Sequence, residues 1–207
     1  MTTILRIDAS SRNADGGSVS RAISDRIEKA LAARPGTSVM RRDLATMPLP
    51  HIAAKTIAGF FTPDPEMTEE LRTATALSDQ LITELKSADI LVLTVPMYNF
   101  SIPSALKAWI DQIIRIGHTF AFDGTSFTGL LTGKKAYVAC SYGASGYASG
   151  QPFAAANFVE PYLRFLLGFL GIADVMFFSV EATTGGEDAT RVNKNAAMMA
   201  VDIALAA

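Results

Sequence analysis

Residues 90–100 read ILVLTVPMYNF, an apolar run that passes into an aromatic loop with a proline at its start. The run over 90–95 is short and rich in Ile, Leu and Val, which predicts a buried β-strand. Comparable runs predict further strands at 3–7, 38–42, 136–140 and 175–180. Runs that are apolar at nearly every position are typical of a parallel sheet covered on both faces.

Segments with helical periodicity separate these runs. The predicted helices cover 19–31, 71–85, a segment from a cap at Ser101 to about 117, roughly 153–170, and 188–206. Ser101 can cap its helix because Pro103 then falls in the first turn. Gly171 is a plausible stop for the helix before it. Strands therefore alternate with helices along the whole chain.

This alternation predicts an α/β protein with a five-stranded parallel sheet of order 2-1-3-4-5 and helices on both faces. Ligands of such sheets bind at the carboxyl ends of the strands, near the switch point, which selects the loops after residues 7, 95 and 140. We expect residues 1–207 to form one domain. Longer connections at 44–67 and 118–133 are available as lids or contact surfaces, and Asp123-Gly124 predicts a tight hairpin in the second.

Composition narrows the class of protein. The formal net charge of −2 includes no basic cluster, which argues against a nucleic-acid partner. The longest apolar stretch of note, 165–173, is too short to cross a bilayer. Cys140 is the single cysteine, so no internal disulfide is possible and a reducing cytoplasm is the expected compartment. Hydrophobic residues make up 49% of the chain, which fits a doubly covered sheet or a buried subunit interface.

Several common site motifs are missing. No two glycines lie two positions apart, so the G-x-G core of a dinucleotide fingerprint cannot be drawn. The segment 129–135 is one residue short of a P-loop and is better interpreted as a turn into the fourth strand. His51 and His118 have no second histidine or Cys-x-x-Cys pair nearby, so no metal site is expected. G-x-S-x-G, the motif of an α/β-hydrolase nucleophile, is absent as well.

The first selected loop, 9–21, offers an anion site. Free N–H groups at the start of the following helix attract negative charge, and the hydroxyls of Ser10, Ser18 and Ser20 can donate to phosphate oxygens. A terminal monophosphate would fit there. The alternative is ordinary helix capping by Ser18 in a polar turn.

The other two loops suggest a flat ligand. Met97, Tyr98 and Phe100 supply apolar surface for a ring system, and prolines on both sides restrict the backbone. The alternative is a packed turn at a subunit contact. The loop 141–150 is rich in small residues, as a backbone that closes on a ligand edge would be.

The chain resembles the FMN-dependent NADH:azoreductases, a family of flavodoxin-like quinone and azo-dye reductases. The resemblance covers nearly the whole length and is most specific at Pro96-Met97-Tyr98-Asn99-Phe100 and at Ser18-Val19-Ser20, the family's S-x-S phosphate loop. It implies a flavodoxin-like three-layer sandwich and a homodimer with active sites at the interface. It also implies two-electron ping-pong chemistry, in which NADH reduces FMN and the flavin then reduces a quinone or azo compound.

The resemblance also implies roles for individual residues. FMN would be held by Ser10, Ser18, Val19 and Ser20 at the phosphate, by Pro96, Met97, Tyr98, Asn99 and Phe100 at the isoalloxazine, and by Ser141, Tyr142 and Gly143 at the pyrimidine edge. The substrate contacts that we expect are Asn99 by hydrogen bonding, Phe100 by stacking and Phe120 as a wall. No side chain is needed as a catalytic acid or base, because flavin N5 takes the hydride.

One departure from the family concerns the third loop. Where the family usually reads Ser-Arg-Gly-Gly, this chain reads Ser141-Tyr142-Gly143-Ala144, so that a cation is lost beside the ring and the potential or substrate choice can differ. Three alternatives stay open. They are an NADPH-preferring quinone or metal-ion reductase of a neighbouring family, a flavodoxin-like electron carrier, and a scaffold protein without flavin.

Overall fold

The computed structural model of the protein describes residues 1–13 and 15–206. Ala14, in the first predicted ligand loop, and Ala207, at the end of the predicted domain, lie outside the described residues. The strands are β1 (Thr2–Asp8), β2 (Thr37–Asp43), β3 (Ile90–Pro96), β4 (Phe120–Phe122), β5 (Phe127–Gly129), β6 (Lys135–Ser141) and β7 (Asp174–Val180). The α-helices are α1 (Val19–Ala32), α2 (Ala54–Phe61), α3 (Glu69–Ser87), α4 (Ser104–Ile113), α5 (Glu160–Phe169) and α6 (Glu187–Leu205), with 3-10 turns at Asp64–Glu66 and Ala154–Ala156.

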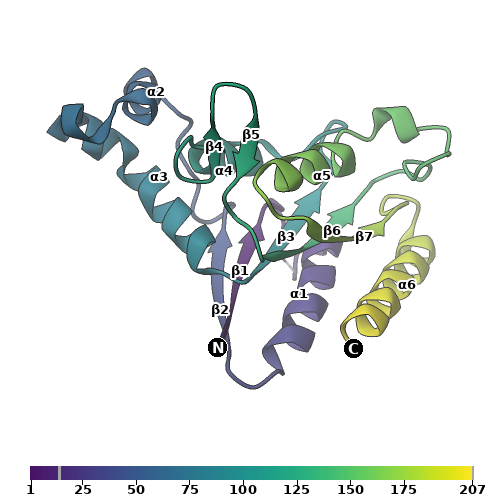
Figure 1. The fold of residues 1–207 in the computed structure, drawn as a ribbon. Helices are drawn as coiled ribbons and strands as arrows, with labels where there is room; N and C mark the ends of the chain where they lie inside the picture. The colour runs from purple at the N-terminus through teal and green to yellow at the C-terminus, as the bar shows by residue number, and fades with distance from the viewer. Residues whose placement is uncertain (14, 207) are drawn as a thin grey trace.

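The main sheet has the order β2-β1-β3-β6-β7, and every neighbouring pair is parallel (Figure 1). With the small hairpin left out of the count, this is the predicted order 2-1-3-4-5, so the fold prediction is confirmed. The strand order reverses between β1 and β3. Ligand-binding loops are therefore expected at the carboxyl ends of these two strands.

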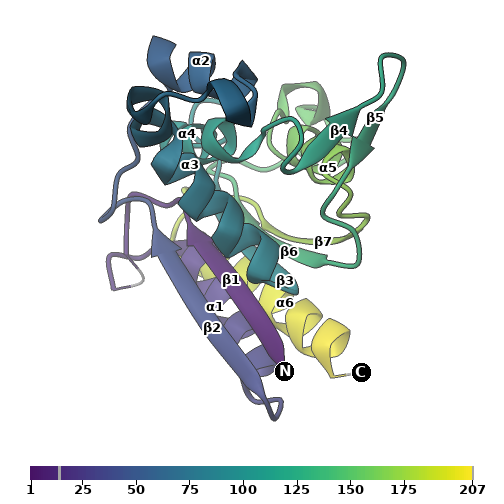
Figure 2. The same ribbon diagram turned by 60° about the vertical axis from the view of Figure 1, so that its left-hand side comes forward.

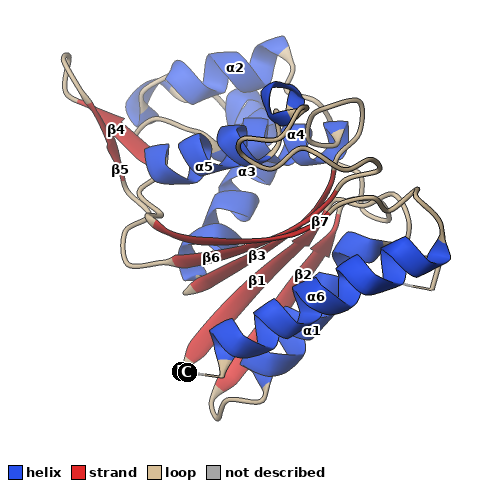
Figure 3. Cartoon of the chain, turned by 90° about the vertical axis from the view of Figure 1, so that its right-hand side faces the viewer, coloured by secondary structure: helices blue, strands red, loops and turns tan. Residues whose placement is uncertain are grey.

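Helices cover both faces of the sheet, α1 and α6 on one side and α3, α4 and α5 on the other (Figure 3). The side chains of β3 point alternately to the two faces of the sheet. Leu91 and Leu93 pack toward α3 and α4, and Val92 packs toward α1. This explains the unbroken apolar runs in the sequence, because each strand has two faces to bury. Of the helices in residues 1–13 and 15–206, none is long and apolar enough to cross a membrane.

The face of β1 beneath α1 carries charge. The Arg6 guanidinium donates to Asp8 at 3.0 Å and to Asp25 at 2.6 Å, and both Arg6 and Asp8 are only 4% exposed. Thr94 donates to Asp8 from the neighbouring strand at 2.6 Å. Buried charges need such partners, since an unpaired one costs several kcal/mol, on the order of the stability of a domain. The network fixes the end of β1 from which the first loop departs.

Three predicted helix limits, in two helices, are wrong. Ser101 does not cap α4: Pro103 is the N-cap, and Ser101 instead forms a bridge with Tyr98. The helix also ends at Ile113, well short of 117. In the same way, α5 begins only at Glu160, after a loop and a 3-10 turn. In both helices, backbone contacts made by the neighbouring loop outweigh the helical periodicity of the sequence.

The predicted hairpin at Asp123-Gly124 is confirmed. The strands β4 and β5 pair antiparallel, and the Asp123 carboxylate accepts from the N–H groups of Thr125 and Ser126 at 2.9 and 2.8 Å. The hairpin projects from the body of the molecule (Figure 2). Its base rests on the end of α5, where Gly171 has a φ of +96° and stops the helix as expected.

Candidate functional site

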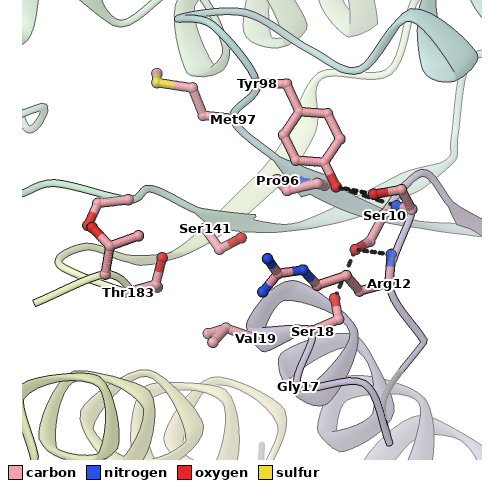
Figure 4. Close-up of a pocket in the computed structure, with 13 residues that line it drawn as sticks. Ser10, Arg12, Gly17, Ser18, Val19, Pro96, Met97, Tyr98, Ser141 and Thr183 are labelled. Atoms are coloured by element: carbon pink, nitrogen blue, oxygen red, sulfur yellow. Dashed lines mark hydrogen bonds between the residues drawn. The ribbon is translucent and has the colours of Figure 1, made fainter. Parts of the chain in front are cut away.

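A cavity of about 290 Å³ opens at the carboxyl ends of β1, β3, β6 and β7 (Figure 4). It is lined by Ser10, Ser11, Arg12, Gly17, Ser18, Val19, Pro96, Met97, Tyr98, Ser141, Gly143, Thr183 and Thr184. All three loops that the sequence selected contribute, and the loop after β7 adds a fourth wall. The cavity thus lies at the switch point, where doubly wound sheets bind their ligands.

Hydroxyl groups gather at the end of the cavity formed by the first loop. Ser18 caps α1, since its Oγ accepts from the N–H of Arg21 at 3.3 Å, and it also donates to Ser10 Oγ at 2.9 Å. Ser10 and Ser18 are nearly buried. The N–H groups of the first turn, including that of Val19, have no acceptor within the helix. Two hydroxyls and a helix N-terminus therefore face the same space, which is the arrangement that anions prefer.

Arg21 holds this loop in place from below. Its guanidinium donates to the Ser10 carbonyl oxygen at 2.8 Å and to both carboxylate oxygens of Asp43 at 2.7 and 2.8 Å. Asp8 lies 3.4 Å away. These bonds, led by the one to Asp43, raise the pKa of Arg21 above its ordinary value. The charge of Arg21 is therefore neutralised by the Asp43 and Asp8 carboxylates, and its side chain supports the backbone of Ser10.

The loop after β3 forms a rigid wall. Tyr98 and Ser101 exchange two backbone hydrogen bonds, of 3.0 and 3.1 Å, around Asn99 and Phe100, whose φ values are +48° and +71°. Positive φ at both central positions defines a type I′ turn, which is strained for a residue such as Phe. The Tyr98 hydroxyl also bonds Ser11, at 2.7 Å to its Oγ and 3.2 Å to its N–H (Figure 4). The wall is thereby tied to the first loop.

The third loop is held by main-chain bonds. Met97 donates its N–H to the Ser141 carbonyl at 2.8 Å, which joins two walls of the cavity. Thr184 donates from both its N–H and its hydroxyl to the Gly143 carbonyl, at 3.0 and 2.8 Å. The Glu181 carboxylate accepts two further N–H groups of this loop. A segment that is rich in small residues is thus fixed by its neighbours.

Four predicted cofactor contacts do not line the cavity: Ser20, Asn99, Phe100 and Tyr142. Tyr142 is 1% exposed and stacks on Tyr147 in the core, with ring centroids 5.4 Å apart. The Tyr142 ring therefore points into the protein and does not line the cavity, and its contact with the pyrimidine edge of the flavin stays a prediction. Ser20 is fully buried, with its Oγ 3.4 Å from that of Ser18, and its side chain does not reach the cavity.

The expected substrate residues also lie outside the cavity lining. Asn99 and Phe100 sit at the tip of the turn, and Phe100 is 53% exposed. Phe120 packs in the hairpin against Phe127 and Phe169, with centroids 5.9 and 4.9 Å apart. Phe120 therefore does not line the cavity within one chain, and its role as a substrate wall stays a prediction.

Five lining residues were not assigned from the sequence: Ser11, Arg12, Gly17, Thr183 and Thr184. The two threonines follow β7, and the rule that selects the carboxyl ends of strands would have found them had it been applied to the last strand. Arg12 lies inside the first selected loop, but nothing in the sequence tells which arginines of that loop are paired.

The lining contains no carboxylate, histidine or cysteine. Cys140 lies close by but is fully buried, and burial raises the pKa of its thiol to about 12. A thiol that stays protonated is a poor nucleophile. Within residues 1–13 and 15–206, no cluster of His, Cys, Asp and Glu could hold a metal ion. The site can bind and orient, but its side chains cannot transfer electrons.

The sheet order and the cavity at its carboxyl edge define a flavodoxin-like α/β protein. Residues 2–201 match the family model described as a flavodoxin-like fold. The chain is 53% identical over 176 residues to an FMN-dependent NADH:quinone oxidoreductase of Xanthobacter autotrophicus, a match that covers 84% of each protein. A relative of the same description in Hyphomonas neptunium is 45% identical over 190 residues, or 91% of this chain and 88% of the relative.

Solved structures agree with these matches. An azoreductase from Bacillus anthracis superimposes with a TM-score of 0.89 at 25% identity, over 99% of each chain. The chain belongs to the family of FMN-dependent NADH:quinone oxidoreductases, whose structural neighbours are azoreductases. The resemblance noted in the sequence is confirmed.

Proposed function

We propose that the protein uses NADH to reduce quinones and azo compounds by two electrons, with FMN as its cofactor. The observation that carries this proposal is the division of the cavity into two ends. Ser10, Ser18 and the start of α1 make a polar end for a phosphate, and Pro96 to Tyr98 make an apolar end for a ring. Residues 1–207 would then form a single FMN-binding domain.

The residues present fit FMN by the chemistry of their donors. Hydroxyls and free helix N–H groups suit a terminal phosphate, and the apolar side chains of Pro96 and Met97 suit the face of a flat heterocycle. FMN, when bound, supplies the two-electron redox chemistry that the side chains lining this cavity do not offer. The work left to the protein is to bind the cofactor, orient it and shape the space above it.

Asn99 and Phe100 are the residues that we assign to the substrate. The turn presents both at its tip, and the strain at Phe100 is maintained although a glycine would relieve it. A large aromatic side chain, half exposed and on strained backbone, is consistent with stacking on a flat acceptor. Asn99 is placed to hydrogen-bond a carbonyl or azo group of that acceptor.

A homodimer with active sites at its interface is part of the proposal. Phe158 is 59% exposed and donates its N–H to the Phe100 carbonyl at 3.2 Å, so a backbone hydrogen bond joins two residues with exposed aromatic side chains. Exposed aromatic patches of this kind mark interaction surfaces. A second copy that covers them would close the substrate space. We place the protein in the cytoplasm, in keeping with its single reduced and buried Cys140.

An anaerobic spectral titration tests the function. The protein is saturated with FMN, reduced with NADH, and then mixed with a quinone or an azo dye. We expect NADH to bleach the bound flavin and either acceptor to restore its colour within a turnover. Protein that remains colourless after FMN is added would instead be a scaffold that has lost the cofactor.

Two arms of the same assay separate the remaining alternatives. Initial rates with NADPH that exceed those with NADH would favour the NADPH-preferring class. Reduction that is slow with two-electron acceptors, but fast with a one-electron partner protein, would favour an electron carrier.

A further inference from the structure

Two arginines belong to the segment that forms the phosphate end of the cavity, residues 9–21, and they differ in their partners. Arg21 is buried and bonded to Asp43, as described above. Arg12 donates its backbone N–H to Ser10 Oγ at 3.3 Å, but within the described part of the chain its guanidinium takes part in no hydrogen bond or ion pair. Figure 4 shows this side chain reaching across the cavity toward Ser141 and Thr183. One cation is thus neutralised and the other is free.

The cavity lining has no other charge. Its thirteen residues include no carboxylate, so the positive charge of Arg12 is not compensated by the walls. The hydroxyls of Ser10 and Ser18 and the N–H groups of α1 are neutral donors. A phosphate that bound to them alone would keep its full negative charge, in a cleft where solvent screening is weaker than in bulk water.

We propose that Arg12 pairs with the phosphate of the cofactor and makes the protein discriminate FMN from riboflavin, which lacks the phosphate. This inference rests on the proposed function. A guanidinium suits the role because its fork of N–H groups matches two phosphate oxygens at once. Arg12 also lies two residues from Ser10 on the same loop, and its flexible stem lets the head turn toward the anion.

The test compares the two flavins. Apoprotein is titrated with FMN and with riboflavin by quenching of flavin fluorescence, at about 20 mM and about 500 mM NaCl, because salt screens an ion pair. The variants are Arg12→Gln, which removes the charge, and Arg12→Lys, which keeps it without the fork. Lys29→Gln is the control, since Lys29 is an exposed cation ten residues beyond Val19, the first residue of α1, and so about 15 Å from the start of the helix.

We expect Arg12→Gln to weaken FMN binding about tenfold at low salt, the size of one charge-assisted hydrogen bond, and to leave riboflavin binding unchanged. The loss should shrink at high salt. Arg12→Lys should recover part of the affinity, and Lys29→Gln should match the unmodified protein.

If Arg12→Gln lowers the affinity for both flavins equally, or for neither, the role of Arg12 is overturned. The proposed function is unaffected by that result as long as the wild-type protein binds FMN. If Arg12 serves the NADH or the acceptor instead, its loss will raise their KM without changing FMN affinity, which also overturns the inference. Wild-type protein that binds neither flavin contradicts the proposed function and this inference together.

Discussion

Replacing Arg21 by Met tests how the phosphate loop is supported. The substitution keeps an apolar stem but removes the guanidinium that bonds Asp43 twice and the Ser10 carbonyl once. Breaking a buried ion pair from one side costs about 3–5 kcal/mol, and since the Asp43 side chain is 25% exposed we take the lower limit, about 3 kcal/mol. For a chain of 207 residues this corresponds to a fall in Tm of about 6–12 °C.

Thermal unfolding followed by circular dichroism measures this fall. The matched control is Arg26→Met on the same helix: Arg26 also makes two bonds with an aspartate, Asp202, at 2.6 Å each, but both side chains are almost half exposed. Solvent screens such a pair, so we expect a far smaller change in Tm. The double variant Arg21→Met/Asp43→Asn should recover part of the loss, because it leaves no unpaired carboxylate at position 43. Equal changes in Tm for the two arginine variants would refute the role of Arg21 in supporting the phosphate loop.

Three further outcomes are expected. Asn99→Ala should slow turnover with both NADH and quinone more than it loosens FMN, and unchanged steady-state rates would remove Asn99 from the substrate contacts. The bond from Arg21 is the main reason why the pKa of Asp43 lies below its ordinary 3.8. The stability that this pair supplies is therefore complete above about pH 4 and is lost as the pH falls through the lower, folded-state pKa, so Asp43→Asn should flatten the acid limb of a plot of Tm against pH. Gly129→Ala should destabilise the protein, since a Cβ there would lie 2.1 Å from the Gly171 nitrogen, and a Tm equal to that of the wild type would show that the hairpin is not seated on that backbone.

The sheet was predictable because its three central strands, β1, β3 and β6, are buried on both faces. A strand that is covered on both faces is apolar at nearly every position, as in residues 90–95. Such a run can be recognised in the sequence without knowing which strands or helices pack against it. The limits of α4 were not predictable in the same way. Serine is a residue type that often caps helices, but the backbone of Ser101 pairs with that of Tyr98 in a β-bridge. The residue types alone do not reveal that contact.

The candidate site shows the same division. Its position followed from the strand order, and so did three of the four loops that form it. The direction of individual side chains did not follow. Tyr142 turns into the core because Tyr147 stacks on it, and Phe120 is held by rings in β5 and α5. Whether Arg12 or Arg21 is free depends on where Asp43 falls at the end of β2, which is a tertiary fact.

The type I′ turn at Tyr98–Ser101 sets a rule for anyone who wishes to redesign the range of acceptors. Both central residues have positive φ, so the backbone admits Gly, Asn or Asp at positions 99 and 100 and penalises Val, Ile and Thr, whose branched Cβ crowds the chain in that region. A library that randomises these two positions would therefore lose many members to misfolding before any substrate is offered. Diversity is better placed on neighbouring side chains such as Phe158, with the turn left as it is.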